Sequence, residues 1–284
     1  METLYYSRPE IKITASGVSV KINSDVFVIQ ELDKISNIML VTKSGYISIY
    51  ALRLFSLKKV TLTLHNLNGE ILYHIIPEQS NQYLDNRILQ YDKFLHSRLQ
   101  IAEQIIKAKR EKYQSLLKQY KLPLLTNDNE NVFSNEYFAR IGQLFTDYGY
   151  NFYSRKGFYA TSNQKAITII NSLLNFYYGL VEHRLLNDVS YYGLDYSISY
   201  LHEPQYNKLS LTYDLIEFLR SDIDNVVLKM AKDRKIKLSD FQLTDKGYYM
   251  LKEQHIPKYL KAISPIESKS KDTVKGFIQM LSKA

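Results

Sequence analysis

Residues Val60–Gln82, VTLTLHNLNGEILYHIIPEQSNQ, mark the point at which the character of this chain changes. The segments Val60–His65 and Ile71–Ile76 are rich in β-branched residues, and between them lies Asn68-Gly69, a pair typical of a tight hairpin turn. The polar run PEQSNQ then ends the strand pattern. The stretch therefore predicts a β-hairpin that closes a β-rich segment.

The residues before this hairpin also favour a sheet. Short β-branched and aromatic segments alternate with turns, and they predict strands at Lys12–Thr14, Val18–Ile22, Val26–Ile29 and Ile38–Val41. Apolar residues at helical spacing predict one helix over Tyr46–Leu57. No acid and histidine cluster occurs in this half, so we interpret His65 and His74 as ordinary strand residues.

Beyond residue 80 the apolar spacing becomes helical. The predicted helices are Leu84–Tyr120, Glu136–Tyr148, Gln164–Val189, Leu209–Lys235 and Thr244–Ile263. We therefore predict an α+β fold, in which a small N-terminal β domain (residues 1–79) precedes a larger all-helical C-terminal domain (residues 80–284). The first domain is expected to serve folding and dimer contacts, and the second catalysis.

Composition narrows the class of protein. The 284 residues carry a formal charge of +8, with a pI near 9.2, which favours binding to polyanions such as nucleic acid. The absence of cysteine excludes disulfides and thiolate metal sites. The start of the chain lacks the apolar region of a secretory signal, and the apolar stretch Ala166–Val181 is too short to span a bilayer. We expect a cytoplasmic protein with no membrane partner.

A constellation of polar residues lies within Tyr191–Arg220, YYGLDYSISYLHEPQYNKLSLTYDLIEFLR. His202 follows a loop, and a predicted helix then carries Asp214 and Glu217, which are three residues apart and share one helix face. One nitrogen and two hard oxygens suit Mg²⁺ or Mn²⁺ better than a structural zinc. The same acid spacing is also typical of a solvated helix face, so the residues alone leave both interpretations open.

The order of these motifs resembles the CRISPR-associated protein one (Cas one) family, the integrases of spacer acquisition. The similarity covers about residues 1–255 as spaced positions. The resemblance rests on Gly193–Asp195, the Leu201-His202 pair, the Asp-x-x-Glu of Asp214 and Glu217, the asparagine and tyrosine segment Asn171–Tyr178, and Glu136 with Ala139 and Phe145.

The resemblance implies a set of site residues. Glu136, His202 and Asp214 would hold a Mg²⁺ or Mn²⁺ ion, and Glu217 would complete the catalytic set as a nearby acid that ligates the ion through water or orients one of its ligands. The family often has glycine after its glutamate, whereas Tyr137 stands here. Glu130 is therefore the alternative first carboxylate.

The resemblance also implies an activity and its partners. The protein would join the 3′-hydroxyl ends of short foreign DNA duplexes with single-stranded 3′ ends to CRISPR repeat DNA, as part of antiviral defence. It would act as a homodimer, assembled with a second, small CRISPR-associated protein that bridges two dimers. Two other functions stay open: a metal-dependent endonuclease or resolvase of branched DNA, and a non-catalytic DNA-binding scaffold.

Basic residues suggest where DNA would bind. Arg155 and Lys156 are interleaved with aromatic residues in the segment Tyr148–Ser162, a pattern suited to a single-stranded end. Lys229, Lys232 and Lys235 follow the acidic helix, and a second basic cluster lies on the first long helix at Lys107, Lys109, Arg110 and Lys112. Each cluster can equally be a solvated helix face.

Overall fold

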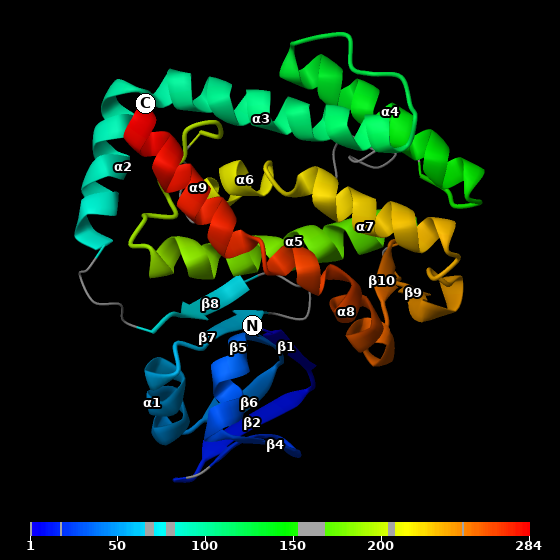
Figure 1. The fold of residues 1–284 in the computed structure, drawn as a ribbon. Helices are drawn as coiled ribbons and strands as arrows, with labels where there is room; N and C mark the ends of the chain where they lie inside the picture. Colours follow the sequence, from blue (N-terminus) through cyan, green and yellow to red (C-terminus); the bar gives the residue numbers. More distant parts are fainter. Residues whose placement is uncertain are drawn as a thin grey trace. The chain divides into compact units, whose positions relative to one another are not determined.

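The computed structural model describes residues 2–17, 19–65, 71–77, 83–152, 168–203, 208–245 and 247–284. The chain divides into two compact units, Met1–Leu84 and Asp85–Ala284 (Figure 1). Strands dominate the first unit and helices the second, which confirms the predicted α+β fold class. The predicted boundary at residues 79/80 lies outside the described residues.

Two four-stranded sheets form the first unit. One has the order β1-β5-β7-β8, and the other has the order β4-β3-β2-β6. The bounds are β1 (Glu2–Ser7), β2 (Glu10–Ala15), β3 (Ser19–Ile22), β4 (Asp25–Val28), β5 (Ile35–Val41), β6 (Ser44–Ile47), β7 (Thr61–His65) and β8 (Ile71–Ile75). Strands β7 and β8 pair antiparallel, as predicted from the sequence, although the turn at Asn68-Gly69 lies outside the described residues. His65 and His74 lie in these two strands, as predicted.

The predicted helix over Tyr46–Leu57 is shorter in the structure. Helix α1 spans Ile49–Leu57, because residues up to Ile47 pair in parallel with β2 as strand β6. The Ser48 hydroxyl accepts a hydrogen bond from the Ala51 backbone N–H and so caps the helix. A short 3₁₀ helix, η1 (Ile29–Lys34), leads from β4 into β5.

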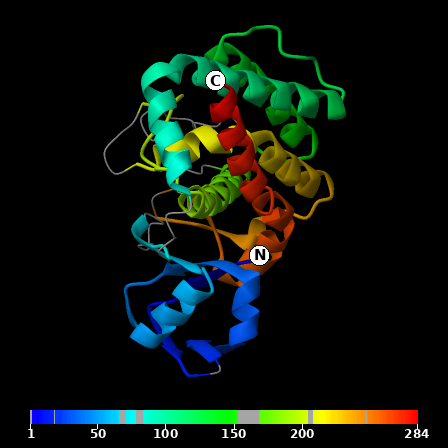
Figure 2. The same ribbon diagram turned by 60° about the vertical axis from the view of Figure 1, so that its left-hand side comes forward.

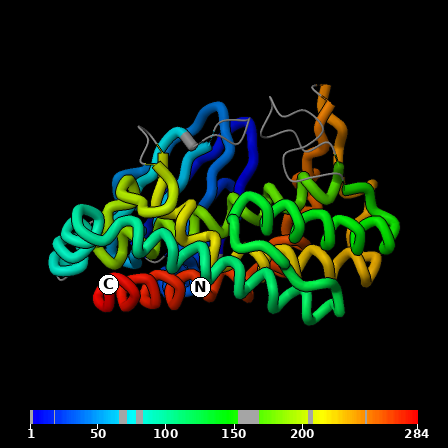
Figure 3. The backbone as a smooth tube through the Cα atoms, turned by 90° about the horizontal axis from the view of Figure 1, so that it is seen from above, coloured from blue at the N-terminus to red at the C-terminus, as the bar shows by residue number. Residues whose placement is uncertain are grey.

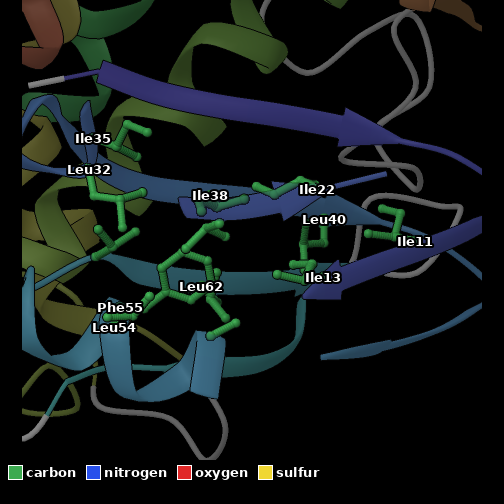
Figure 4. Packing of buried hydrophobic residues seen from close by; sticks show 13 residues of the cluster. Ile11, Ile13, Ile22, Leu32, Ile35, Ile38, Leu40, Leu54, Phe55 and Leu62 are labelled. Atoms are coloured by element: carbon green, nitrogen blue, oxygen red, sulfur yellow. The ribbon is translucent and has the colours of Figure 1, made fainter. Parts of the chain in front are cut away.

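The core of the first unit joins both sheets to α1. Ile13 and Ile22 come from one sheet, Ile38 and Leu62 from the other, and Phe55 from the helix (Figure 4). Strand β5 is buried along its whole length, which explains why its sequence does not alternate between apolar and polar residues. Removal of this apolar surface from water stabilises the unit.

Eight α-helices account for most of the described part of the second unit. Their bounds are α2 (Leu84–His96), α3 (Arg98–Gln119), α4 (Glu130–Asp147), α5 (Ile169–Tyr191), α6 (Ser210–Ile216), α7 (Arg220–Lys232), α8 (Ile256–Glu267) and α9 (Ser270–Lys283). Helix α5 is buried on nearly all sides and contacts α6, α7, α8 and α9, and Figure 2 shows it enclosed by its neighbours. No helix among the described residues is long and apolar enough to cross a membrane.

The second unit departs from an all-helical arrangement at the predicted helix Thr244–Ile263. There the structure has a two-stranded hairpin, β9 (Phe241–Leu243) and β10 (Tyr249–Leu251), between two 3₁₀ helices, η3 (Leu238–Asp240) and η4 (Glu253–His255). Gly247, at φ +76°, provides a turn conformation that other residues rarely adopt. The helix predicted over Leu84–Tyr120 is divided at Ser97, and the one over Leu209–Lys235 is divided at residues 217–219.

Two leucines of the first unit provide a matched test of its core. Leu62 is 2% exposed in the core, and Leu57 is 69% exposed at the end of α1. We expect Leu62→Ala to lower the free energy of unfolding by about 2–5 kcal/mol, because the lost methyl groups leave a cavity. Leu57→Ala should change it by less than about 0.5 kcal/mol. Chemical denaturation followed by circular dichroism measures both, and equal losses would contradict this description of the core.

Candidate metal and DNA site

The loop before His202 is fixed by helix α2. Gly193, at φ +73°, ends α5 in a left-handed conformation that favours glycine. The buried Gln90 side chain then accepts a hydrogen bond from the Asp195 N–H at 2.7 Å and donates to the carbonyls of Asp195 and Ile198. The Tyr200 hydroxyl donates to the Gln90 carbonyl at 2.8 Å. These contacts hold the loop at a defined place on the helical unit.

Asp214 organises the end of this loop. Its fully buried carboxylate accepts hydrogen bonds from three consecutive backbone N–H groups, those of Tyr200 (2.6 Å), Leu201 (3.1 Å) and His202 (3.1 Å). It also lies 2.8 Å from Nδ1 of His202. Since an ionised carboxylate can only accept, Nδ1 donates to it, and in the neutral imidazole Nε2 then carries the lone pair. The His202 side chain is 44% exposed, so Nε2 is available to a ligand.

Glu217 lies just after α6, and its carboxylate is held by two cations. Arg220 donates through Nε to both carboxylate oxygens, at 3.1 Å each, and through Nη2 at 2.7 Å. Lys109 lies 3.0 Å away on α3. Burial alone would raise the pKa of Glu217, but the charges of Arg220 and Lys109 outweigh it and lower the pKa to about 2. The carboxylate is therefore ionised throughout the physiological range.

Lys109 connects Glu217 to Glu130. Its Nζ is 2.7 Å from the Glu130 carboxylate and 3.0 Å from that of Glu217, and the residue is only 6% exposed. Glu130 lies in the first turn of α4, which Asn129 caps. Helices α3 and α4 lie side by side in Figure 3. The structure thus brings two of the candidate acids to one shared cation.

Glu136 lies elsewhere on α4. Its carboxylate accepts hydrogen bonds from the backbone N–H (3.1 Å) and hydroxyl (2.9 Å) of Thr126, and it pairs with Arg140 at 3.1 Å. The Thr126 N–H contributes most to lowering the pKa of Glu136. Residues six apart lie about 120° apart around a helix, so Glu130 and Glu136 occupy different faces. The structure does not bring Glu136 to His202 or Asp214.

Arg220 packs against a buried hydrogen-bond network of two tyrosines and an aspartate. Its guanidinium lies 4.7 Å from the centre of the Tyr178 ring. The hydroxyls of Tyr178 and Tyr137 both donate to the carboxylate of Asp224, the latter at 2.7 Å. Asp224 is fully buried. The network joins α4, α5 and α7, and it fixes the cation that holds Glu217.

Lys109 is predicted from the sequence as part of a basic cluster on a helix, and no role is predicted for Gln90 or Arg220. The spacing of Lys109 contained a signal, because it continues the buried series Ile101, Ile105 and Tyr113 at intervals of four residues. Two other members of that basic cluster are partly neutralised: Arg110 pairs with Asp128, and Lys112 with Asp222. No local pattern identifies Gln90, since its partners are about 105 residues away.

The basic residues after the acidic helix are exposed. Lys229 and Lys232 lie in the last turn of α7, and Lys235 follows it and pairs with Asp233 at 2.8 Å. Their ammonium groups are accessible to phosphate. Arg155 and Lys156 lie outside the described residues.

The donors suit a divalent metal, although they are not gathered around one. Within the described residues, no group of three or more His, Cys, Asp or Glu side chains is arranged to hold a metal ion. Glu130 and Glu217 nevertheless converge on a cation, the Lys109 ammonium, and Nε2 of His202 has a free lone pair. Carboxylate oxygens and an imidazole nitrogen are suitable ligands for Mg²⁺ or Mn²⁺. The residues therefore fit such an ion in donor type.

Comparison with models of known protein families identifies the family of this chain. The model of the family described as CRISPR associated protein Cas1 matches residues 4–132 and 127–264. The chain belongs to this family. A relative from Thermus thermophilus, named CRISPR-associated endonuclease Cas1 3, is 38% identical over 93 residues. That match spans 32% of this chain and 28% of the relative.

Several solved structures share the fold of this chain. A CAS1 protein from Thermotoga maritima matches 99% of this chain and 97% of its own with a TM-score of 0.83 at 17% identity. A casposase bound to integration product matches 95% of this chain and 82% of its own, with a TM-score of 0.76 at 24% identity. A chain of a Cas6-RT-Cas1–Cas2 complex matches 99% of this chain and 35% of its own, with a TM-score of 0.72 at 13% identity. At these identities the likeness shows the fold.

The pKa of Glu217 predicts how its contribution to stability depends on pH. The pKa is lowered from 4.5 to about 2 in the folded chain, which corresponds to about 3 kcal/mol. This stabilisation is fully present above pH 4.5 and is lost as the pH falls toward 2. We therefore expect Glu217→Gln to lower the free energy of unfolding at pH 7, and the difference from wild type to shrink below pH 4.5.

Urea unfolding in metal-free buffer between pH 7 and pH 2.5 measures this difference. Glu111→Gln is the matched control, because Glu111 is exposed on α3. A Glu217→Gln effect that does not change with pH would show that the ion pairs of this carboxylate do not stabilise the fold.

Proposed function

We propose that this chain is a divalent-metal-dependent DNA integrase of CRISPR adaptation. It would join the 3′-hydroxyl ends of short foreign DNA to the repeat array by transesterification. Membership of the Cas1 family supports the proposal, as does the likeness to a casposase whose title describes a bound integration product. The observation that carries it is the Asp214–His202 pair, which leaves an accessible imidazole nitrogen at the acidic helix.

The roles of the acids follow from their contacts. We assign Nε2 of His202 and the carboxylates of Glu130 and Glu217 as the groups that would hold Mg²⁺ or Mn²⁺. Asp214 has both oxygens engaged by N–H groups, which supports a role in orienting His202. The sequence had suggested Glu136, His202 and Asp214 as ligands. When bound, the ion would polarise the phosphodiester and lower the pKa of the attacking hydroxyl.

The reaction places few demands on the protein beyond positioning. The 3′-oxygen forms a new bond to phosphorus, the bond from phosphorus to the leaving 3′-oxygen breaks, and the proton of the attacking hydroxyl passes to the leaving oxygen through solvent. The number of phosphodiester bonds is unchanged, so neither a covalent enzyme intermediate nor an energy source is needed. A rigid site that holds the two DNA ends in line is sufficient.

DNA contacts are proposed on the exposed cations. Lys229, Lys232 and Lys235 would bind phosphates near the acidic helix. Arg155 and Lys156, in their aromatic segment, would hold a single-stranded 3′ end. The substrates would be duplex DNA with such ends and CRISPR repeat DNA.

Partners are proposed from the family. We expect a homodimer formed through the β-rich unit, assembled with the small second CRISPR-associated protein in the cytoplasm. A chain of the same fold occurs in a complex that contains Cas2, which supports this partner.

A metal-dependent endonuclease is the second candidate, since the Thermus thermophilus relative is named an endonuclease. It would use the same residues with water as the nucleophile. A non-catalytic DNA-binding scaffold is a third possibility, in which the acids only stabilise the helices.

Two glutamates on α4 allow a paired test of the site. We expect Glu130→Gln to reduce strand transfer by about 100-fold or more, because the amide removes an anionic ligand. Glu136→Gln should retain activity within about 3-fold, because its contacts lie on another face of the helix. Rates of DNA joining with Mn²⁺ measure both variants. The opposite result, with Glu136→Gln inactive and Glu130→Gln active, would return the first ligand to Glu136.

The nature of the nucleophile tests the function itself. Short duplex DNA with free 3′-hydroxyls should become covalently joined to a target that contains a CRISPR repeat, with Mg²⁺ or Mn²⁺ and the partner protein present. The same duplex ending in dideoxynucleotides should not be joined, because it lacks the attacking oxygen. Gel analysis of labelled duplex measures joining.

Cleavage of branched DNA that proceeds equally with blocked ends, without joining, would favour the endonuclease. DNA binding without any metal-dependent strand breakage or joining would favour the scaffold.

A further inference from the structure

The buried ammonium of Lys109 lies between two acids that come from different helices. It contacts Glu130 at 2.7 Å and Glu217 at 3.0 Å, and these carboxylates come from α4 and from the end of α6. Burying a charge is unfavourable unless it is paired, so this lysine contributes to holding the acids together. The same two carboxylates are the proposed ligands of the divalent ion.

The charges around this position are already balanced. Glu130 and Glu217 carry two negative charges, and Lys109 and Arg220 carry two positive charges. Addition of a divalent ion to this group would leave a net charge of +2 in a poorly solvated site, where repulsion between cations is strong. Binding of the ion is therefore expected to displace one of the resident cations.

Lys109 is the cation that can leave. Arg220 is held by three hydrogen bonds to Glu217 and lies over the Tyr178 ring, which Asp224 fixes in turn. Lys109 ends in a flexible four-carbon chain and makes one contact to each acid, and its ammonium lies 5.8 Å from the centre of the Tyr113 ring, a longer aromatic contact than that of Arg220. Glu130 is partly exposed, which gives the ammonium a path toward solvent.

We propose that Lys109 is an exchangeable internal cation, which keeps Glu130 and Glu217 in place when no metal is bound and which a divalent ion displaces on binding. The inference rests on the proposed function for the identity of the ion. It makes Lys109 a positioning residue that sets metal affinity. A lysine that only stabilised the fold would not compete with the ion.

Binding of Mn²⁺ alone to the full chain tests this exchange. Isothermal titration calorimetry of Lys109→Gln should give a Kd about 10-fold or more below that of wild type, because the ion no longer displaces a charge. Lys112→Gln is the control, since Lys112 is exposed on the same helix and pairs with Asp222. Its Kd should equal that of wild type. An unchanged or higher Kd in a natively folded Lys109→Gln overturns the proposal.

The double variant Lys109→Gln/Glu217→Gln provides a second criterion. The effect of the lysine substitution should fall below about 3-fold in the Glu217→Gln background, because the carboxylate for which the two cations compete has been neutralised. An undiminished effect would mean that Lys109 influences Mn²⁺ from elsewhere, and would overturn the exchange.

Wild-type protein offers a measurement that does not depend on any variant folding. Acetylation of Lys109 by acetic anhydride, followed by mass spectrometry, should increase several-fold when Mn²⁺ is added, relative to Lys112. Equal labelling with and without bound Mn²⁺ would overturn the exchange and leave the proposed function intact. Absence of Mn²⁺ binding to wild type and to Lys109→Gln would overturn both.

Discussion

The burial of the Lys109 ammonium between Glu130 and Glu217 is the constraint that brings two acids of the candidate site together. A buried ammonium is tolerated only with close, well-oriented acids, so its two ion pairs fix the positions of three helices relative to one another. Arg220 and the Asp224 network extend the same constraint to α5 and α7. Ion pairs with the buried Lys109 and Arg220 side chains therefore hold Glu130 and Glu217 in position.

Asp214 imposes a second constraint of a different kind. A loop normally satisfies its backbone N–H groups with water, but three consecutive ones here donate to a single buried carboxylate. The same carboxylate selects the His202 tautomer. The Asp214 carboxylate thus both positions the loop and orients the His202 imidazole. We expect substitution of Asp214 to disturb both.

The sequence predicted the parts of the fold that local patterns determine. Segments rich in β-branched residues on either side of Asn68-Gly69 predicted the antiparallel pairing of β7 and β8, and helical spacing predicted most of the second unit. It did not predict the β9–β10 hairpin, because the apolar residues of Thr244–Ile263 also fit a helix. The division at Ser97 was equally invisible, since both flanking segments continue the helical pattern.

The candidate site was predictable only in part. The prediction that His202 and Asp214 lie close together is confirmed by their 2.8 Å contact, and it was possible because only twelve residues separate them in the sequence. The sequence left Glu136 and Glu130 as alternative carboxylates. The structure shows that they have different partners, Arg140 for Glu136 and Lys109 for Glu130, and which of them binds a metal stays a prediction. Lys109 was missed because a charged residue at a buried helical position becomes visible only when its partners on other helices are known.

The net charge of +8 also needs the structure for its interpretation. Lys109, Arg184 and Arg220 are paired with acids inside the helical unit and contribute little to the field outside. Lys229 and Lys232 are exposed at the carboxyl end of α7, where the helix dipole favours cations. Basic residues therefore fall into two groups in this chain: those inside are paired with acids of the helical unit, and those outside, such as Lys229 and Lys232, are exposed to solvent. A simple count of charges cannot separate the two, and burial does.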